Sequence, residues 1–189
     1  MQGGGTSFVV TIALLRPTEI QNVTIPHTKF EILHQESIPT TTPDETINNA
    51  CNFFRKHSPE RGYDALGIGT FGPVGVNEND PETYGRILPG SPKKDWRNVD
   101  ILSPILSACS GRDETGSKPV FKVETDVNAP AMAEYEYNTK VLNKKSMTSL
   151  AYITVGTGIG VGLVVNGKPV HGMMHPEGGH VPIIPLSGT

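Results

Sequence analysis

Residues Thr154 to Gly172 read TVGTGIGVGLVVNGKPVHG, and this stretch does most to decide the fold. Four glycines fall within its first nine residues, among threonine, isoleucine and valine. Glycine between apolar strands usually marks a place where another group comes close to the backbone. The Asn166-Gly167 pair is the dipeptide that type I′ hairpin turns prefer. The stretch therefore predicts strands joined by a glycine turn with a close neighbour, followed by a hairpin.

The first third of the chain predicts two strands and a helix. Apolar runs predict strands over 7–15 and 30–38, and the polar, proline-containing segment 16–28 between them predicts a loop. Thr42 is an expected helix N-cap, because proline follows at the first helical position and glutamate lies three residues after the cap. Apolar residues recur at helical spacing after it, and the helix is expected to end near residues 57–59.

Strands and helices alternate through the rest of the chain, which predicts an α/β architecture. Pro130 is compatible with a helix there, because it falls in the first turn. The polar link at 110–118 is the expected boundary between an N-terminal domain over 1–115 and the beginning of a C-terminal domain over 116–189. The patterns predict a strand over 63–77 that runs into a glycine turn, a loop over 83–97, a short helix over 103–108, a strand over 119–126, a helix over 128–142 and a strand over 150–155.

Composition narrows the class of protein. The net charge is −3, which argues against nucleic acid as the main partner, since phosphate binding usually shows as a basic balance. No apolar run approaches the length of a membrane span, and no secretory signal is visible at the N-terminus. Cys51 and Cys109 each lie in an apolar, helix-like stretch, which predicts buried free thiols and a cytoplasmic protein.

Two glycine-threonine turns are candidate anion sites. One comprises residues 3–6 and includes Gly4, Gly5 and Thr6; the other surrounds Thr157 and Gly158. Glycine lets backbone N–H groups turn towards an anion, and the threonine hydroxyl adds a donor. Neither turn matches a P-loop or opens a helix, so nucleotide sites of those two kinds are not expected. The alternative for each turn is a tight β-turn without a ligand.

Asp126 and Asn128 follow a predicted strand at its C-terminal end, the edge of an α/β sheet where ligands bind. There Asp126 could take a proton from a hydroxyl as a general base, while Asn128 orients the substrate. The alternative is that both residues cap the following helix, a role that Asp and Asn favour.

The segment His175-Pro176-Glu177-Gly178-Gly179-His180 is a third candidate. Glu177 and His180 could hydrogen-bond a polyol or bind a metal, or they could belong to a polar surface loop. A closed zinc site needs four ligands, usually with cysteine, and no cysteine follows His180 in this chain. The turn around Gly72 has either a binding role or the role of a tight turn.

In this order, the motifs resemble the sugar kinases of the ROK family, and most closely the fructokinase branch. The resemblance implies the two-domain actin/hexokinase fold, which is ribonuclease-H-like, with ATP and a sugar meeting between the domains. It also implies Mg²⁺ as a cofactor, a hexose substrate with fructose favoured, and a homodimer. The matching stretches are GGGTSFV, IPTTTPDETI, GIGTFGPVGVN, SPKKDW, TDVNAPAMAE, YITVGTGIGVGLVVNGKPVHG and HPEGGH.

The resemblance also implies roles for individual residues. Asp126 would be the catalytic base. The sugar would be held by the turn around Gly72 together with Asn128, Glu177 and His180. The site for the phosphates of ATP would be lined by Gly4, Gly5, Thr6, Thr157 and Gly158. His180 would also match a ligand of the family's structural zinc ion.

The chain departs from the family pattern at both ends. Gln2 stands where the family has an acid at the end of its first strand, so that strand is expected to be essentially absent. Zn²⁺ is not expected to bind, because the cysteines that would join His180 are missing. The chain is thus interpreted as a piece of a fructokinase, marginally stable and inactive by itself. The alternative function is a catalytically inactive sugar-binding or regulatory module.

Overall fold

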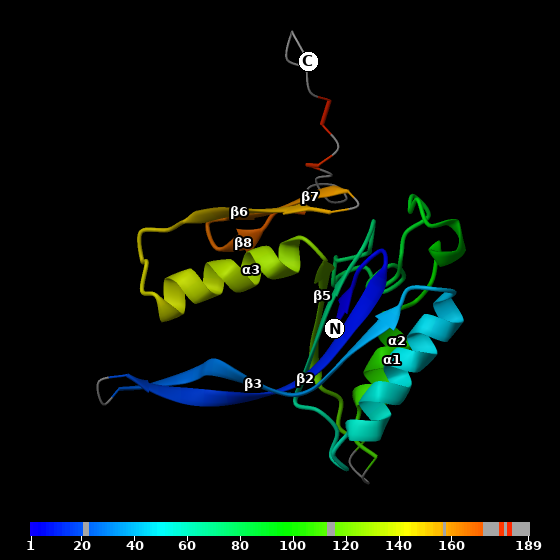
Figure 1. The fold of residues 1–189 in the computed structure, drawn as a ribbon, viewed down its shortest axis with the longest axis horizontal. Coiled ribbons are helices and arrows are strands. Elements are labelled where there is room, and N and C mark those ends of the chain that lie inside the picture. Colours follow the sequence, from blue (N-terminus) through cyan, green and yellow to red (C-terminus); the bar gives the residue numbers. More distant parts are fainter. Residues whose placement is uncertain (21–22, 113–115, 157, 172–177, 180, 183–189) are drawn as a thin grey trace. The chain divides into compact units, whose positions relative to one another are not determined.

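The computed structural model describes all residues except 21–22, 113–115, 157, 172–177, 180 and 183–189, and its fold is drawn in Figure 1. The chain forms two compact units, Met1–Asp126 and Val127–Thr189, which are described in turn. None of the described helices is long and apolar enough to cross a membrane.

The first unit is built on a five-stranded sheet with the order β3-β2-β1-β4-β5. The strands β1, β4 and β5 run parallel to one another, whereas β2 and β3 are antiparallel to their neighbours. Gly3 pairs with Thr70, and Thr70 pairs with Thr125, so these three strands end in register at one edge of the sheet. The strands are β1 Gln2–Gly3, β2 Ser7–Ile20, β3 Val23–Pro39, β4 Ala65–Thr70 and β5 Val120–Thr125.

Two helices, α1 (Pro43–His57) and α2 (Leu102–Cys109), pack against each other and against the sheet of the first unit (Figure 1). The predicted cap of α1 is confirmed, because the Thr42 hydroxyl accepts the Glu45 N–H at 3.4 Å. The short 3₁₀ helix η1 (Lys94–Trp96) lies in the expected loop. The core includes Phe8, Val10, Ile38, Ala50, Cys51, Phe54, Ile68, Ile87, Trp96, Ile105, Cys109 and Val123.

The prediction of a loop over 16–28 is wrong, because β2 and β3 continue through most of this segment as a hairpin. The two strands continue to pair from Arg16↔Lys29 to Thr18↔Ile25, across a shift in register (Figure 1). Proline has no N–H to donate and is tolerated where a ladder is irregular, so the prolines in this segment do not end the strands. The first strand, expected to be essentially absent, is present as two residues that pair with β2 and β4.

The second unit contains a three-stranded antiparallel sheet with the order β6-β7-β8 and a helix packed on it. The predicted type I′ hairpin is confirmed between β7 and β8, because Asn166 and Gly167 both have positive φ values, of 51° and 74°. The elements are α3 Asn128–Glu136, the π-helical turn η2 Tyr137–Val141, β6 Ser149–Val155, β7 Ile159–Val165 and β8 Lys168–Pro169.

The two compact units divide between Asp126 and Val127 rather than in the polar link at 110–118. The reason is that β5 follows that link and pairs with β4, which makes it part of the first sheet. The domain limits expected for the family fold, 1–115 and 116–189, stay a prediction.

Candidate functional site at the edge of the first sheet

The parallel strands bring three of the sequence motifs together at one edge of the first sheet. The turn after β1 holds Gly4 and Gly5, the turn after β4 holds Gly72, and Asp126 follows β5. Two backbone hydrogen bonds join these strand ends: the Phe71 N–H donates to the Gly3 carbonyl at 2.7 Å, and the Asp126 N–H donates to the Thr70 carbonyl at 2.8 Å. Ligands of α/β sheets bind at such edges, outside the carboxyl ends of parallel strands.

The first glycine turn is fixed from within the fold. The Gly4 N–H donates to the Ser7 carbonyl at 2.9 Å, and a methyl group on Gly4 would lie only 3.0 Å from that oxygen. Thr40 holds the turn twice, through its hydroxyl to the Gly4 carbonyl and through its N–H to the Thr6 carbonyl, both at 2.9 Å. Within the described part of the chain, the N–H groups of Gly5 and Thr6 have no hydrogen-bond partner, so both are available to an anion.

A buried hydroxyl lies under the same turn. Thr70 is fully buried, and its hydroxyl is the one buried side-chain oxygen or nitrogen among the described residues without a hydrogen-bond partner. A methyl group on Gly3 would lie 2.9 Å from this oxygen. Buried polar atoms are rarely left unpaired, and water or an ion is a common partner. The turn therefore fits a phosphate group in two respects: it has open amides, and methyl groups on Gly3 and Gly4 would crowd their neighbours.

Asp126 is half-buried immediately after β5. The alternative role predicted for Asp126 and Asn128 was to cap the helix that follows. The N-cap position of α3 is Val127, which makes no side-chain hydrogen bond. The role of Asp126 as a base stays a prediction.

Asn128 has a clear structural task in the second unit. Its side chain is buried, its Nδ2 donates to the Val170 carbonyl at 3.1 Å, and its Oδ1 accepts the Leu163 N–H at 3.0 Å. These bonds tie the first turn of α3 to β7 and to the residue after β8. The predicted contact between Asn128 and a sugar is not tested by them.

The glycines of the opening stretch divide into two groups. A methyl group on Gly162 would overlap the Val127 carbonyl oxygen, and one on Gly160 would lie 2.6 Å from Val127 Cγ1. Their close neighbour is therefore the chain itself, at the start of α3. Gly156 and Gly158 have no described atom within 4 Å of the position that a methyl group would take. Among the described residues, space for a ligand is left only beside this second group.

Several predicted site residues lie outside the described residues, namely Thr157, Glu177 and His180. Two glycines of the same HPEGGH motif are described. A methyl group on Gly179 would overlap the Ile159 carbonyl oxygen, and one on Gly178 would lie 3.1 Å from Val161 Cβ. Gly178 and Gly179 therefore lie against the first residues of β7, which follow Gly158 in the chain.

The described residues contain no group of three or more His, Cys, Asp or Glu side chains that could hold a metal ion. The predicted zinc ligand, His180, is not among those residues. Magnesium usually binds through one or two carboxylates and the phosphates of a substrate. At the sheet edge, Asp126 is the carboxylate that would meet such an ion.

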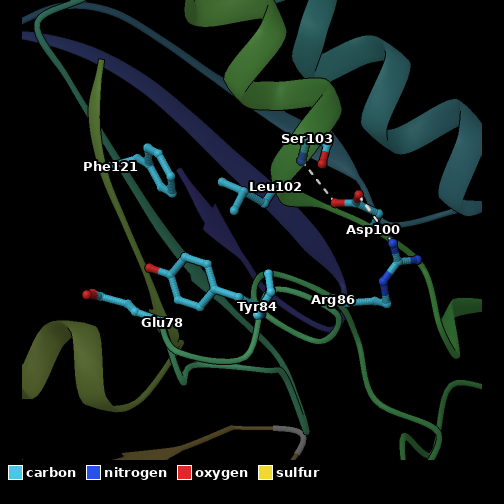
Figure 2. Close-up of a pocket in the computed structure, with 8 residues that line it drawn as sticks. Glu78, Tyr84, Arg86, Asp100, Leu102, Ser103 and Phe121 are labelled. Atoms are coloured by element: carbon cyan, nitrogen blue, oxygen red, sulfur yellow. Dashed lines mark hydrogen bonds and ion pairs between the residues drawn. The ribbon is translucent and has the colours of Figure 1, made fainter. Parts of the chain in front are cut away.

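A separate cavity of about 410 Å³ lies in the first unit, away from these motifs (Figure 2). Its polar groups are occupied by structural contacts. Asp100 pairs with Arg86 at 3.5 Å and accepts the Ser103 N–H at 2.9 Å, and the Tyr84 hydroxyl accepts the Val123 N–H at 3.0 Å. Glu78 pairs with Lys122. None of the predicted site residues lines this cavity.

Comparison with known proteins shows which family the chain belongs to. Residues 18–188 match the model of the ROK family. The fructokinase of Zymomonas mobilis is 35% identical over 186 residues, which cover 97% of this chain and 53% of that protein. The fructokinase of Streptococcus mutans is 35% identical over 185 residues, which cover 98% of this chain and 53% of that protein. The chain thus spans about half the length of the curated relatives it matches.

A solved structure supports the fold. The ROK family glucokinase from Streptomyces griseus, in complex with glucose and AMPPNP, matches with a TM-score of 0.55 and 24% identity, over 82% of this chain and 44% of that one. The architecture is the α/β, actin/hexokinase-like fold that the motifs predicted. Because the family model matches most of its length, the chain belongs to the ROK family.

Proposed function

We propose that the protein phosphorylates a hexose with ATP, and that fructose is the favoured substrate. The single observation that carries this proposal is the arrangement at the edge of the first sheet. There, a glycine turn with two open amides and a half-buried aspartate follow strands that are joined through Thr70. The relatives named above are fructokinases, which supports the choice of sugar. The proposal includes a cytoplasmic homodimer.

The proposal assigns the predicted site residues to the nucleotide, the sugar and a structural metal ion. Gly4, Gly5 and Thr6 bind phosphate oxygens of ATP, together with Thr157 and Gly158. The sugar is held by the turn around Gly72 and by Asn128, Glu177 and His180. A structural Zn²⁺ ion would involve His180, and no catalytic step depends on it.

The reaction needs one proton acceptor. The carboxylate of Asp126 takes the proton from the attacking sugar hydroxyl, whose oxygen forms a bond to the γ-phosphorus. The bond between that phosphorus and the β–γ bridging oxygen breaks, and ADP leaves with the electron pair. When bound, Mg²⁺ neutralises phosphate charge. The protein itself mainly orients the reactants, which is its usual contribution to phosphoryl transfer.

The test is an assay of ADP release with fructose, glucose and mannose, together with calorimetric titration of each sugar. It is run on residues 1–189 and on the longest natural chain that contains them. Turnover fastest with fructose is the expected result. Turnover with another hexose would correct only the substrate. If fructose and ATP bind without turnover in either chain, the protein is a sugar-binding module, and if neither binds, the whole proposal is wrong.

A further inference from the structure

Lys93 lies beside the first glycine turn, although it is almost ninety residues away in the sequence. A methyl group on Gly5 would be 3.7 Å from Lys93 Cε, which is an ordinary van der Waals distance. Lys93 is also the only described residue within 4 Å of that position. Lys93 belongs to the SPKKDW stretch, in which the sequence motifs predict no site residue.

The backbone around Lys93 is anchored. Its N–H donates to the Ser91 hydroxyl at 3.3 Å, and its carbonyl accepts the Trp96 N–H at 3.0 Å. Trp96 is buried and donates its indole N–H to the Thr41 carbonyl at 3.2 Å. The position of Lys93 therefore follows from a buried anchor rather than from the preferences of a free surface loop.

The charge on Lys93 is not paired with any described carboxylate. Among the described residues Lys93 forms no ion pair, and its Nζ lies 5.6 Å from the centre of the Phe71 ring. The half-buried side chain thus lies beside both the Phe71 ring and Gly5, whose amide and that of Thr6 are open. Open amides and a lysine ammonium are two complementary ways in which proteins bind phosphate.

We propose that Lys93 binds the γ-phosphate of ATP, together with the amides of Gly5 and Thr6, and neutralises it during transfer. This inference rests on the proposed function. In the transfer step written above, the sugar proton goes to Asp126, and Lys93 keeps its own proton throughout. Its ammonium contacts the phosphoryl oxygens while the phosphorus passes from ADP to the sugar oxygen. ADP lacks this phosphoryl group, so Lys93 distinguishes ATP from ADP.

The experiment compares the affinities of Mg·AMPPNP and Mg·ADP for wild type and three variants. Lys93→Met keeps the apolar stem over Phe71 and removes the charge, whereas Lys93→Arg keeps the charge. Lys94→Met is the matched control, because Lys94 is exposed and is not within 4 Å of the Gly5 position. Calorimetric titration measures each dissociation constant, and circular dichroism with thermal unfolding checks the fold of each variant.

Lys93→Met is expected to weaken the binding of AMPPNP roughly 10- to 100-fold, which is the effect of losing one charge-assisted hydrogen bond. The affinity for ADP should stay unchanged. Lys93→Arg should restore part of the loss, and Lys94→Met should resemble wild type. If the ratio of AMPPNP to ADP affinity stays at the wild-type value in Lys93→Met, the lysine only covers Phe71 and the inference is wrong. If wild type binds neither nucleotide, the proposed function fails, and this inference fails with it.

Discussion

Asp126 is the residue at which a chemical role and a structural role can be separated. Asp126→Asn keeps the size of the side chain and removes the proton acceptor, so turnover should fall roughly 10²- to 10⁴-fold. Nucleotide affinity should change far less than turnover, because the amides of Gly5 and Thr6 are untouched. Steady-state kinetics with titration of AMPPNP measure both quantities. Near-full turnover in the variant would show that Asp126 is not the base.

At the same scale, Thr157 offers a second test of the phosphate site. Thr157→Val keeps the branched shape and removes the hydroxyl donor, so the dissociation constant for ATP should rise with little change in the unfolding temperature. Thr154→Val is a control from the neighbouring strand β6. An unchanged ATP affinity in Thr157→Val would mean that this turn has no nucleotide contact.

At the scale of elements, the start of α3 and strand β7 depend on glycine. Gly162→Ala should lower the free energy of unfolding by about 1–3 kcal/mol, the usual cost of overpacking, because its methyl group would overlap the Val127 carbonyl. Gly158→Ala is the matched control, since nothing described lies within 4 Å of its methyl position. Urea unfolding measures both, and equal stability of the two variants would contradict the packing described here.

How far the sequence predicts these elements depends on how local their signals are. The helix cap at Thr42-Pro43 and the hairpin turn at Asn166-Gly167 are each predicted from adjacent residues. Both predictions are confirmed. The hairpin over 16–28 is missed because its prolines suggest a loop, whereas pairing with a partner strand continues past them. Lys93 has no local signal at all, because its place beside Gly5 comes from the tertiary fold.

The glycine stretch shows the same limit for the site. From sequence, the four glycines in its first nine residues predict a group close to the backbone, which could be a ligand or the chain itself. The structure gives Gly160 and Gly162 a neighbour within the chain and leaves Gly156 and Gly158 open. Whether a glycine is needed for packing depends on how close the start of α3 lies to it. The sequence around the glycines does not show that distance.

At the scale of the whole molecule, stability should fall in alkali. Burial raises the pKa of Cys109 to about 12, and burial likewise raises the pKa of Tyr63 to about 12. Both groups lose their protons at lower pH in the unfolded chain, so their contribution to stability is complete below pH 8 and is lost between about pH 9 and 12. The loss is at most about 1.4 kcal/mol per pH unit for each group.

The measurement is urea unfolding at several values between pH 7 and pH 10. Wild type should lose stability steadily above about pH 8.5, the ordinary pKa of a free thiol. The Cys109→Ala variant should have a lower free energy of unfolding at pH 7, because the substitution leaves a small cavity. Its free energy of unfolding should then fall less steeply as the pH rises. Parallel curves for the two proteins would mean that the Cys109 thiol ionises equally easily in the folded and unfolded chains.

The two hydrogen bonds from Thr40 to the first glycine turn have a further consequence. The Thr40 amide is protected from solvent only while the turn keeps its shape, so deuterium uptake at this one position records how often the turn opens. A nucleotide that fastens the turn from the other side should slow that uptake. The Gly62 amide, bonded to the Pro59 carbonyl, should exchange at an unchanged rate. Deuterium uptake at the Thr40 amide thus reports whether a ligand occupies the turn, and the measurement needs no label on the ligand.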